Sequence, residues 1–158
     1  MPDASDMTNN DQTPQLRQSS RSLPIALLRA RERVMGPIRK ILASENVTEQ
    51  QWRVLRVLAE MGQLDSSELA HHACLLAPSL TRILQGLETR GLIQRSNSTS
   101  DRRKSLVTIS QMGLELIQRV LPATNSLFSH LEETFGKRES EYLLDLLNAL
   151  DALPLNGE

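Results

Sequence analysis

The sequence predicts a mainly α-helical protein of the α+β class, in which one β-hairpin interrupts a series of helices. Apolar residues recur at the three- and four-residue spacing of helix faces along most of the chain. Only two short segments, 92–95 and 105–109, read as strands, and the polar segment between them is too long for a two-residue turn. With 158 residues the chain can form one proper core, and its 3% of aromatic residues leaves that core mainly to Leu, Ile, Val and Ala.

Two helices are expected in the first part of the chain. Ser22 is typical of an N-cap and opens a long helix that ends near residue 43. A Gly-Pro pair at 36–37 predicts a kink or weak turn in this helix rather than its end. The segment 48–51, Thr-Glu-Gln-Gln, has the form of a capping box and begins a second helix over 49–60.

Two shorter helices follow. The segment 65–68, Asp-Ser-Ser-Glu, offers another cap and begins a helix that reaches about Ala73. Pro78 suits the first turn of the next helix, and Gly91 is a natural residue just past its end.

The hairpin and two further helices complete the chain. Ser110 caps a long helix over 111–135, in which Pro122 predicts a bend, and Gly136 separates it from a last helix over 138–153 that is densely apolar on one side. Three short helices followed by a β-hairpin match a winged helix-turn-helix unit. We therefore expect a disordered polar arm over 1–20, a winged helix-turn-helix lobe over 46–110, and dimerisation helices over 21–45 and 111–155.

The helix over 78–91 has an unusual polar face. Its leucines share one side, whereas the opposite side is short-chained and hydrogen-bonding rather than a mixture of Glu and Lys. Such a face can approach a nucleic-acid groove closely, because Arg pairs with guanine, Gln pairs with adenine, and Ser or Thr reaches bases or phosphates. A neutral polar surface helix is the alternative interpretation. The candidate DNA contacts are Ser79, Thr81, Arg82 and Gln85, with Ser66 at the start of the preceding helix.

A basic cluster lies at the tip of the predicted hairpin. Arg102, Arg103 and Lys104 could lie along a minor groove or on phosphates. Asp101 would repel phosphate, so we expect it to pair with an Arg and fix its direction. The segment 77–105 holds six basic and two acidic side chains, although the chain's net charge is −1. This distribution favours one face aimed at a polyanion, and a solvated charged surface is the alternative.

An ordered set of motifs resembles the MarR family of dimeric bacterial regulators, over about residues 22–153. The motifs are Leu80-Thr81-Arg82, Leu87-Glu88, Gly91-Leu92-Ile93-Gln94-Arg95, Asp101-Arg102-Arg103 and Val107-Thr108-Ile109-Ser110-Gln111-Met112-Gly113. The resemblance implies a homodimer on a pseudo-palindromic operator in double-stranded DNA. Segments 22–32, 48–53 and 78–81 are more narrowly similar to regulators of homoprotocatechuate (hydroxyphenylacetate) degradation operons, which implies repression relieved by a small aromatic carboxylic acid.

Four residues are candidates for binding such an effector. Arg31 falls on the apolar stripe of the first helix, where it needs a partner, either an acidic residue of a second subunit or the carboxylate of a small acid. Trp52 and Arg56 share one helix face and could hold an aromatic carboxylate, although a tryptophan that packs the domain junction is the favoured alternative. Ser22 is a weaker candidate. The resemblance implies a site between the dimerisation helices and the DNA-binding lobe.

Other function classes have less support in the sequence. No Ser/His/Asp set and no Gly-rich phosphate loop is present, so we expect no catalytic residue, no cofactor and no enzyme activity. His71, His72 and Cys74 lack the second ligand pair of a zinc site, and we expect no metal. A regulator that responds to oxidation of Cys74 or to another ligand stays open, although neighbouring leucines favour an inert thiol. A helical protein-interaction module without DNA specificity is the remaining alternative.

The sequence also predicts a cytoplasmic protein with no membrane partner. Residues 1–20 lack the apolar segment of a signal peptide, and no apolar run approaches the ~20 residues of a membrane span. The single cysteine excludes an internal disulfide framework and fits a reducing compartment.

Overall fold

The computed structural model describes residues 18–97 and 105–154, which form two compact units with a boundary between Gly36 and Pro37. The first unit contains a 3-10 turn, η1 (Ser19–Arg21), and the first part of helix α1 (Leu23–Ser44). The amide of Ala26 donates to the carbonyl of Ser22 (2.9 Å), so the helix begins where the sequence predicts. Helix α1 also continues through Pro37, as predicted. The predicted disordered arm lies largely outside the described residues.

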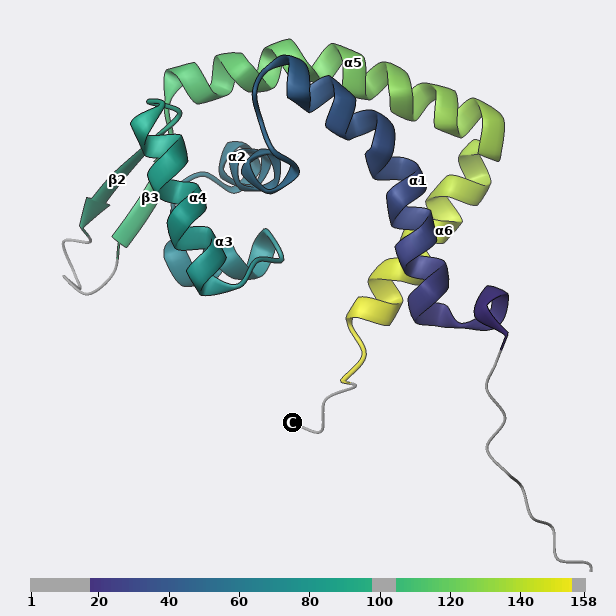
Figure 1. Cartoon of the computed structure of the whole chain (residues 1–158). Coiled ribbons are helices and arrows are strands. Elements are labelled where there is room, and N and C mark those ends of the chain that lie inside the picture. The colour runs from purple at the N-terminus through teal and green to yellow at the C-terminus, as the bar shows by residue number, and fades with distance from the viewer. Residues whose placement is uncertain (1–17, 98–104, 155–158) are drawn as a thin grey trace, which may run out of the picture. The chain divides into compact units, whose positions relative to one another are not determined.

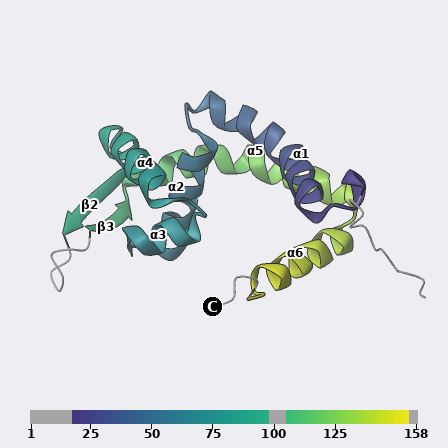
Figure 2. The same ribbon diagram turned by 60° about the horizontal axis from the view of Figure 1, so that its bottom comes forward.

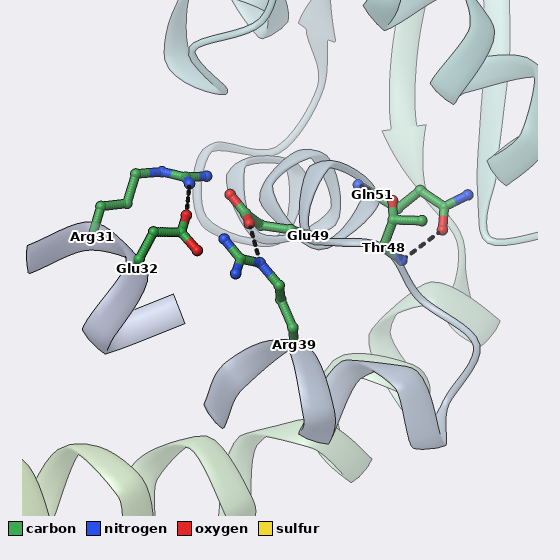
Figure 3. A network of polar contacts seen from close by, with 6 residues as sticks. All are labelled: Arg31, Glu32, Arg39, Thr48, Glu49 and Gln51. Carbon is green, nitrogen blue, oxygen red and sulfur yellow. Dashed lines mark hydrogen bonds and ion pairs between the residues drawn. The ribbon is translucent and has the colours of Figure 1, made fainter. Parts of the chain in front are cut away.

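Three short helices of the second unit follow the predicted order: α2 (Glu49–Met61), α3 (Ser66–His72) and α4 (Ala77–Thr89). The predicted capping box of α2 and the predicted cap of α3 are confirmed. The Gln51 amide donates to Thr48 Oγ1 (3.2 Å), and the Thr48 amide donates to the Gln51 side chain (3.0 Å; Figure 3). Asp65 caps α3 in the same way with Glu68. These local bonds satisfy amide groups that the first helical turn leaves free.

The sheet has three antiparallel strands in the order β1-β3-β2. Strand β3 (Ser105–Ile109) has the predicted bounds, whereas β2 (Ile93–Asn97) runs two residues farther than predicted. No sequence pattern indicates β1 (Leu64–Asp65), because two residues are too short to show an alternation. Leu64 lies opposite the buried Val107, so β1 joins the start of α3 to the hairpin. The hairpin projects from the three helices in two views (Figures 1 and 2).

Two helices complete the second unit. Helix α5 (Gln111–Phe135) begins after the predicted cap, because the Gly113 amide donates to Ser110 Oγ (3.1 Å). Helix α6 (Lys137–Asp151) folds back from the end of α5 (Figure 1).

The core of the second unit is built mainly from leucines, as the composition predicts. Helices α2, α4 and α5 each contribute one apolar face, and α6 buries none of its side chains in the described part of the chain. The large side chains that are almost fully buried are Leu42, Val54, Leu55, Leu58, Leu69, Leu80, Leu84, Leu87, Val107, Leu116 and Val120.

Gly113 lies where the first turn of α5 meets the base of the hairpin. A Cβ at this position would collide with the Leu92 carbonyl and would come within 2.6 Å of Ile109 Cγ1. Backbone cannot move aside as a flexible side chain can, so we expect Gly113→Ala to lower the free energy of unfolding by about 2–3 kcal/mol. Urea denaturation followed by circular dichroism measures this change.

Gly86→Ala is the matched control for this prediction. An added Cβ there meets only the Gln51 side chain, at 3.7 Å. Because Gly86 lies inside α4, alanine should leave stability unchanged or raise it by about 0.5–1 kcal/mol. Equal stability of the two variants would contradict the close packing inferred at Gly113.

Candidate DNA-binding surface

Helix α4 has one buried and one exposed side, as its sequence predicts. Leu80, Leu84 and Leu87 are at most 2% exposed and fix the helix against the lobe. The four predicted contact residues of α4 are exposed on the outer side: Ser79, Thr81, Arg82 and Gln85.

Most of these exposed side chains are available to a ligand. Within the described residues, the side chains of Ser79, Arg82 and Gln85 have no hydrogen-bond or ion-pair partner. Thr81 differs, because its hydroxyl donates to the Ala77 carbonyl (3.1 Å). Thr81 can therefore offer a ligand its methyl group and an acceptor lone pair, but not its hydroxyl hydrogen. The face as a whole can both donate and accept hydrogen bonds.

The other predicted DNA contacts lie around the hairpin. Ser66, in the first turn of α3, is half-buried, and its hydroxyl donates to the Ser105 carbonyl at the start of β3 (3.4 Å). This long bond ties α3 to the hairpin, which sequence reasoning did not foresee. Asp101, Arg102, Arg103 and Lys104 lie outside the described residues, and their role stays a prediction.

The three described arginines of the basic segment have different roles. Arg82 is exposed and free among the described residues. Arg95 lies 3.7 Å from Glu88, and Arg90 donates to two backbone carbonyls of the lobe. The sum of charges over 77–105 therefore overstates the positive charge that this surface presents.

Arg53 of α2 fixes the turn between α3 and α4. Its Nη1 donates to the carbonyls of Ala73 (2.9 Å) and Cys74 (3.2 Å), and Cys74 adopts a positive φ of 51°. The bonds hold a backbone conformation that non-glycine residues rarely adopt. Sequence reasoning missed Arg53 because its acceptors are backbone carbonyls, which no residue type marks.

Two of the candidate effector residues belong to the first unit and two to the second. In the first unit, Ser22 is half-buried and Arg31 is exposed, with an ion pair to its neighbour Glu32 (3.0 Å; Figure 3). In the second unit, Trp52 is only 5% exposed and Arg56 is exposed. The burial of Trp52 is compatible with packing in the core of the second unit, and its place at a domain junction stays a prediction. A role of these four residues in effector binding stays a prediction.

An ion pair within the second unit holds the start of α2. Arg39, near the end of α1, donates through Nε to Glu49, the first residue of α2 (3.0 Å; Figure 3). The contact joins the two helices that precede the helix-turn-helix pair.

The histidine and cysteine candidates do not form a metal centre in the described part of the chain. The rings of His71 and His72 lie 5.3 Å apart, edge to face, and no three potential ligands gather among the described residues. Cys74 is exposed, so the neighbouring leucines do not enclose it as the sequence suggested. No helix of residues 18–97 and 105–154 has both the length and the apolarity that a membrane span requires.

Comparison with known sequences identifies relatives that share most of the chain. A model of the MarR family matches residues 47–105. The HTH-type transcriptional regulator FarR of Neisseria gonorrhoeae is 40% identical over 129 residues, which cover 82% of this chain and 88% of that protein. The homoprotocatechuate degradative operon repressor of Escherichia coli is 39% identical over 132 residues, covering 84% and 89%.

Solved structures agree with these relatives. NadR in complex with 4-hydroxyphenylacetate is 37% identical and superposes with a TM-score of 0.78, covering 88% of this chain and 99% of that chain. The transcriptional repressor CouR, bound to a 23-mer DNA duplex, is 28% identical with a TM-score of 0.78, covering 87% and 99%. The winged helix-turn-helix prediction is confirmed, and so is the expectation of a regulator rather than an enzyme, because the relatives are named as regulators and repressors. The chain belongs to the MarR family of transcriptional regulators.

Proposed function

We propose that the protein is a dimeric repressor of an aromatic-acid catabolic operon, and that a small aromatic carboxylic acid releases it from its operator. One observation carries the DNA-binding part: the exposed side of α4 holds the hydrogen-bonding side chains of Ser79, Arg82 and Gln85, which have no partner within residues 18–97 and 105–154, and its buried leucines keep it rigid. A relative that is named as a homoprotocatechuate degradative operon repressor supports the operon class. Because its ligand is chromosomal DNA, we place its action in the cytoplasm.

Helix α4 would enter the major groove with its exposed side. Arg82 can pair with guanine O6 and N7, and Gln85 with adenine N6 and N7. Ser79, Thr81 and Ser66 would contact bases or phosphates and fix the register of the protein. We assign Arg102, Arg103 and Lys104 to phosphates or the minor groove, with Asp101 orienting one of the arginines.

A second copy of the chain would cover the apolar side chains that remain exposed. In the first unit these are Leu23, Ile25, Leu27 and Leu28, between 37% and 62% exposed. Several exposed large apolar side chains in one short segment favour an interface. A two-fold dimer presents two copies of α4 to half-sites about 34 Å apart, which requires a pseudo-palindromic operator. The exposed apolar residues of α6 are Tyr142, Leu143, Leu144, Leu146 and Leu147.

The effector would act by shifting a population between two spacings of the α4 helices. NadR, which is 37% identical, has been solved with 4-hydroxyphenylacetate, and this supports the aromatic-acid class. We assign the carboxylate to Arg56 or Arg31, the ring to Trp52, and a hydrogen bond to Ser22. Release from DNA requires only that the acid binds more tightly to the dimer whose α4 spacing does not fit the operator than to the dimer whose spacing fits it.

A panel of aromatic acids tests this function on the protein's own promoter DNA. We expect 4-hydroxyphenylacetate or a close relative to raise the dissociation constant of the protein–DNA complex at least about tenfold, a coupling of about 1.4 kcal/mol. Fluorescence anisotropy of labelled DNA measures release, and the emission of the single Trp52 reports binding of the acid directly.

The matched control is 2-(4-hydroxyphenyl)ethanol, which keeps the ring and lacks the carboxylate. It should leave the DNA complex intact, because the charged hydrogen bond to arginine is lost. Release by the alcohol as well, or by none of the acids, would contradict the proposed effector class.

A further inference from the structure

Arg90, at the C-terminal end of α4, reaches the turn that precedes α2. Its Nη1 donates to the Asn46 carbonyl (2.8 Å), and its Nη2 lies 3.3 Å from the Glu45 carbonyl. Asn46 has a positive φ of 54°, so the turn has a defined and sparsely populated conformation. All three residues belong to the second unit.

The same turn is also joined to α5. The Glu45 side chain accepts a hydrogen bond from Nε of Arg119 (3.1 Å), and the two groups form an ion pair. The turn between α1 and α2 is therefore held by α5 through Arg119, and Arg90 bonds the C-terminal end of α4 to the same turn.

Helix α4 is thus held at both ends by guanidinium groups. Arg53 of α2 holds the turn that leads into α4, and Arg90 holds its last turn. A planar guanidinium that bonds two carbonyls fixes direction as well as distance, which a single ammonium group cannot do. The buried leucines hold α4 against the core, and the directional hydrogen bonds of Arg53 and Arg90 add constraints at its two ends that apolar contact, being non-directional, does not supply.

We infer that Arg90 is a positioning residue for sequence-specific DNA reading, which acts through α4 without touching DNA. Its Nη1 and Nη2 each donate to a backbone carbonyl of the turn, whereas Arg82 on the outer side is free among the described residues. The inference rests on the proposed function, in which α4 reads base edges. Hydrogen bonds to bases need accurate geometry, while contacts to phosphates tolerate small displacements.

Arg90→Lys tests the inference because lysine keeps the positive charge but lacks the planar guanidinium that bonds the Asn46 and Glu45 carbonyls together. We expect about a tenfold weaker affinity for the duplex that the wild-type protein protects in its own promoter. The affinity for a scrambled duplex of equal length should stay within twofold of the wild-type value. The slope of affinity against salt concentration should stay the same, because the net charge is unchanged. Both affinities are measured by anisotropy at several salt concentrations.

Two control variants separate positioning from other effects. Arg95→Lys makes the same chemical change on the same lobe, at a residue whose ion pair with Glu88 is long (3.7 Å), and should preserve the ratio of specific to non-specific affinity. Val120→Ala removes a methyl pair from the core, on α5, and leaves the Arg90 bonds in place. If Arg90→Lys lowers thermal stability, Val120→Ala shows how much a loss of stability alone changes the ratio of specific to non-specific affinity.

The outcomes are distinct. A tenfold loss of the specificity ratio in Arg90→Lys alone supports the inference. An unchanged ratio in Arg90→Lys, or an equal loss in Arg95→Lys or in Val120→Ala, overturns it. If the wild-type protein itself does not distinguish the two duplexes, the proposed function fails and the inference falls with it.

Discussion

Replacing Arg82 with alanine should remove most of the sequence preference of the protein. Arg82 lies on the exposed side of α4 and is free among the described residues, and Leu80 and Leu84 beside it are buried and fix the helix. One bidentate arginine–guanine contact contributes about 1–3 kcal/mol of discrimination, and a dimer makes it twice. We therefore expect operator affinity to fall at least about thirtyfold, while non-specific binding changes little.

The measurement is a titration of operator and scrambled duplexes, together with a footprint of the promoter. Arg95→Ala is the matched control, because it removes the same side chain from the same lobe, on strand β2. Losing one positive charge should weaken binding of Arg95→Ala to both duplexes by a similar small factor and reduce the salt dependence. An unchanged footprint and affinity of Arg82→Ala would exclude α4 as the element that reads sequence.

Placing a carboxylate in the apolar face of α6 should divide the dimer. Leu146 is 49% exposed in the single chain, in the middle of the α6 face that we assign to a second copy. Leu146→Asp would bury two unpaired charges in the two-fold interface, at a cost of roughly 3 kcal/mol or more. We expect the dimer dissociation constant to rise at least about a hundredfold. Analytical ultracentrifugation across a concentration series measures it.

Operator binding should fall with the dimer, because a monomer loses the second, effectively intramolecular contact. Helix content should stay the same, since α6 buries no side chain in the described part of the single chain. Asn148→Asp is the control, because it adds the same charge on the side of α6 opposite Leu146, beside Leu144, and should weaken the dimer far less than Leu146→Asp. A dimer that survives Leu146→Asp, or a wild-type protein that is monomeric, would contradict the proposed interface.

Local signals explain why so much of the fold could be predicted. A capping box acts within four residues, so Thr48 and Asp65 mark the starts of α2 and α3 wherever the chain goes next. Ser110 and Gly136 delimit α5 for the same reason, and its predicted bounds agree with the structure. The alternation between leucines and polar residues in α4 likewise determined which side faces outward, because helical periodicity needs no knowledge of the partner surface.

Local patterns in the sequence are enough to predict the helices, most of their caps, the hairpin and the outward face of α4. Long-range contacts, in contrast, set which arginines can meet a ligand: Arg82 is exposed, whereas Arg90 and Arg53 bond carbonyls that lie 44 and 20 residues away in sequence. Tertiary contacts also set the position of β1 and require glycine at 113, where the carbonyl of Leu92, from the segment just before β2, comes close. The physical reason is common to these cases. Every residue carries a backbone carbonyl. The residue types in a sequence therefore do not indicate which carbonyl will accept a long-range hydrogen bond or lie too close to a Cβ.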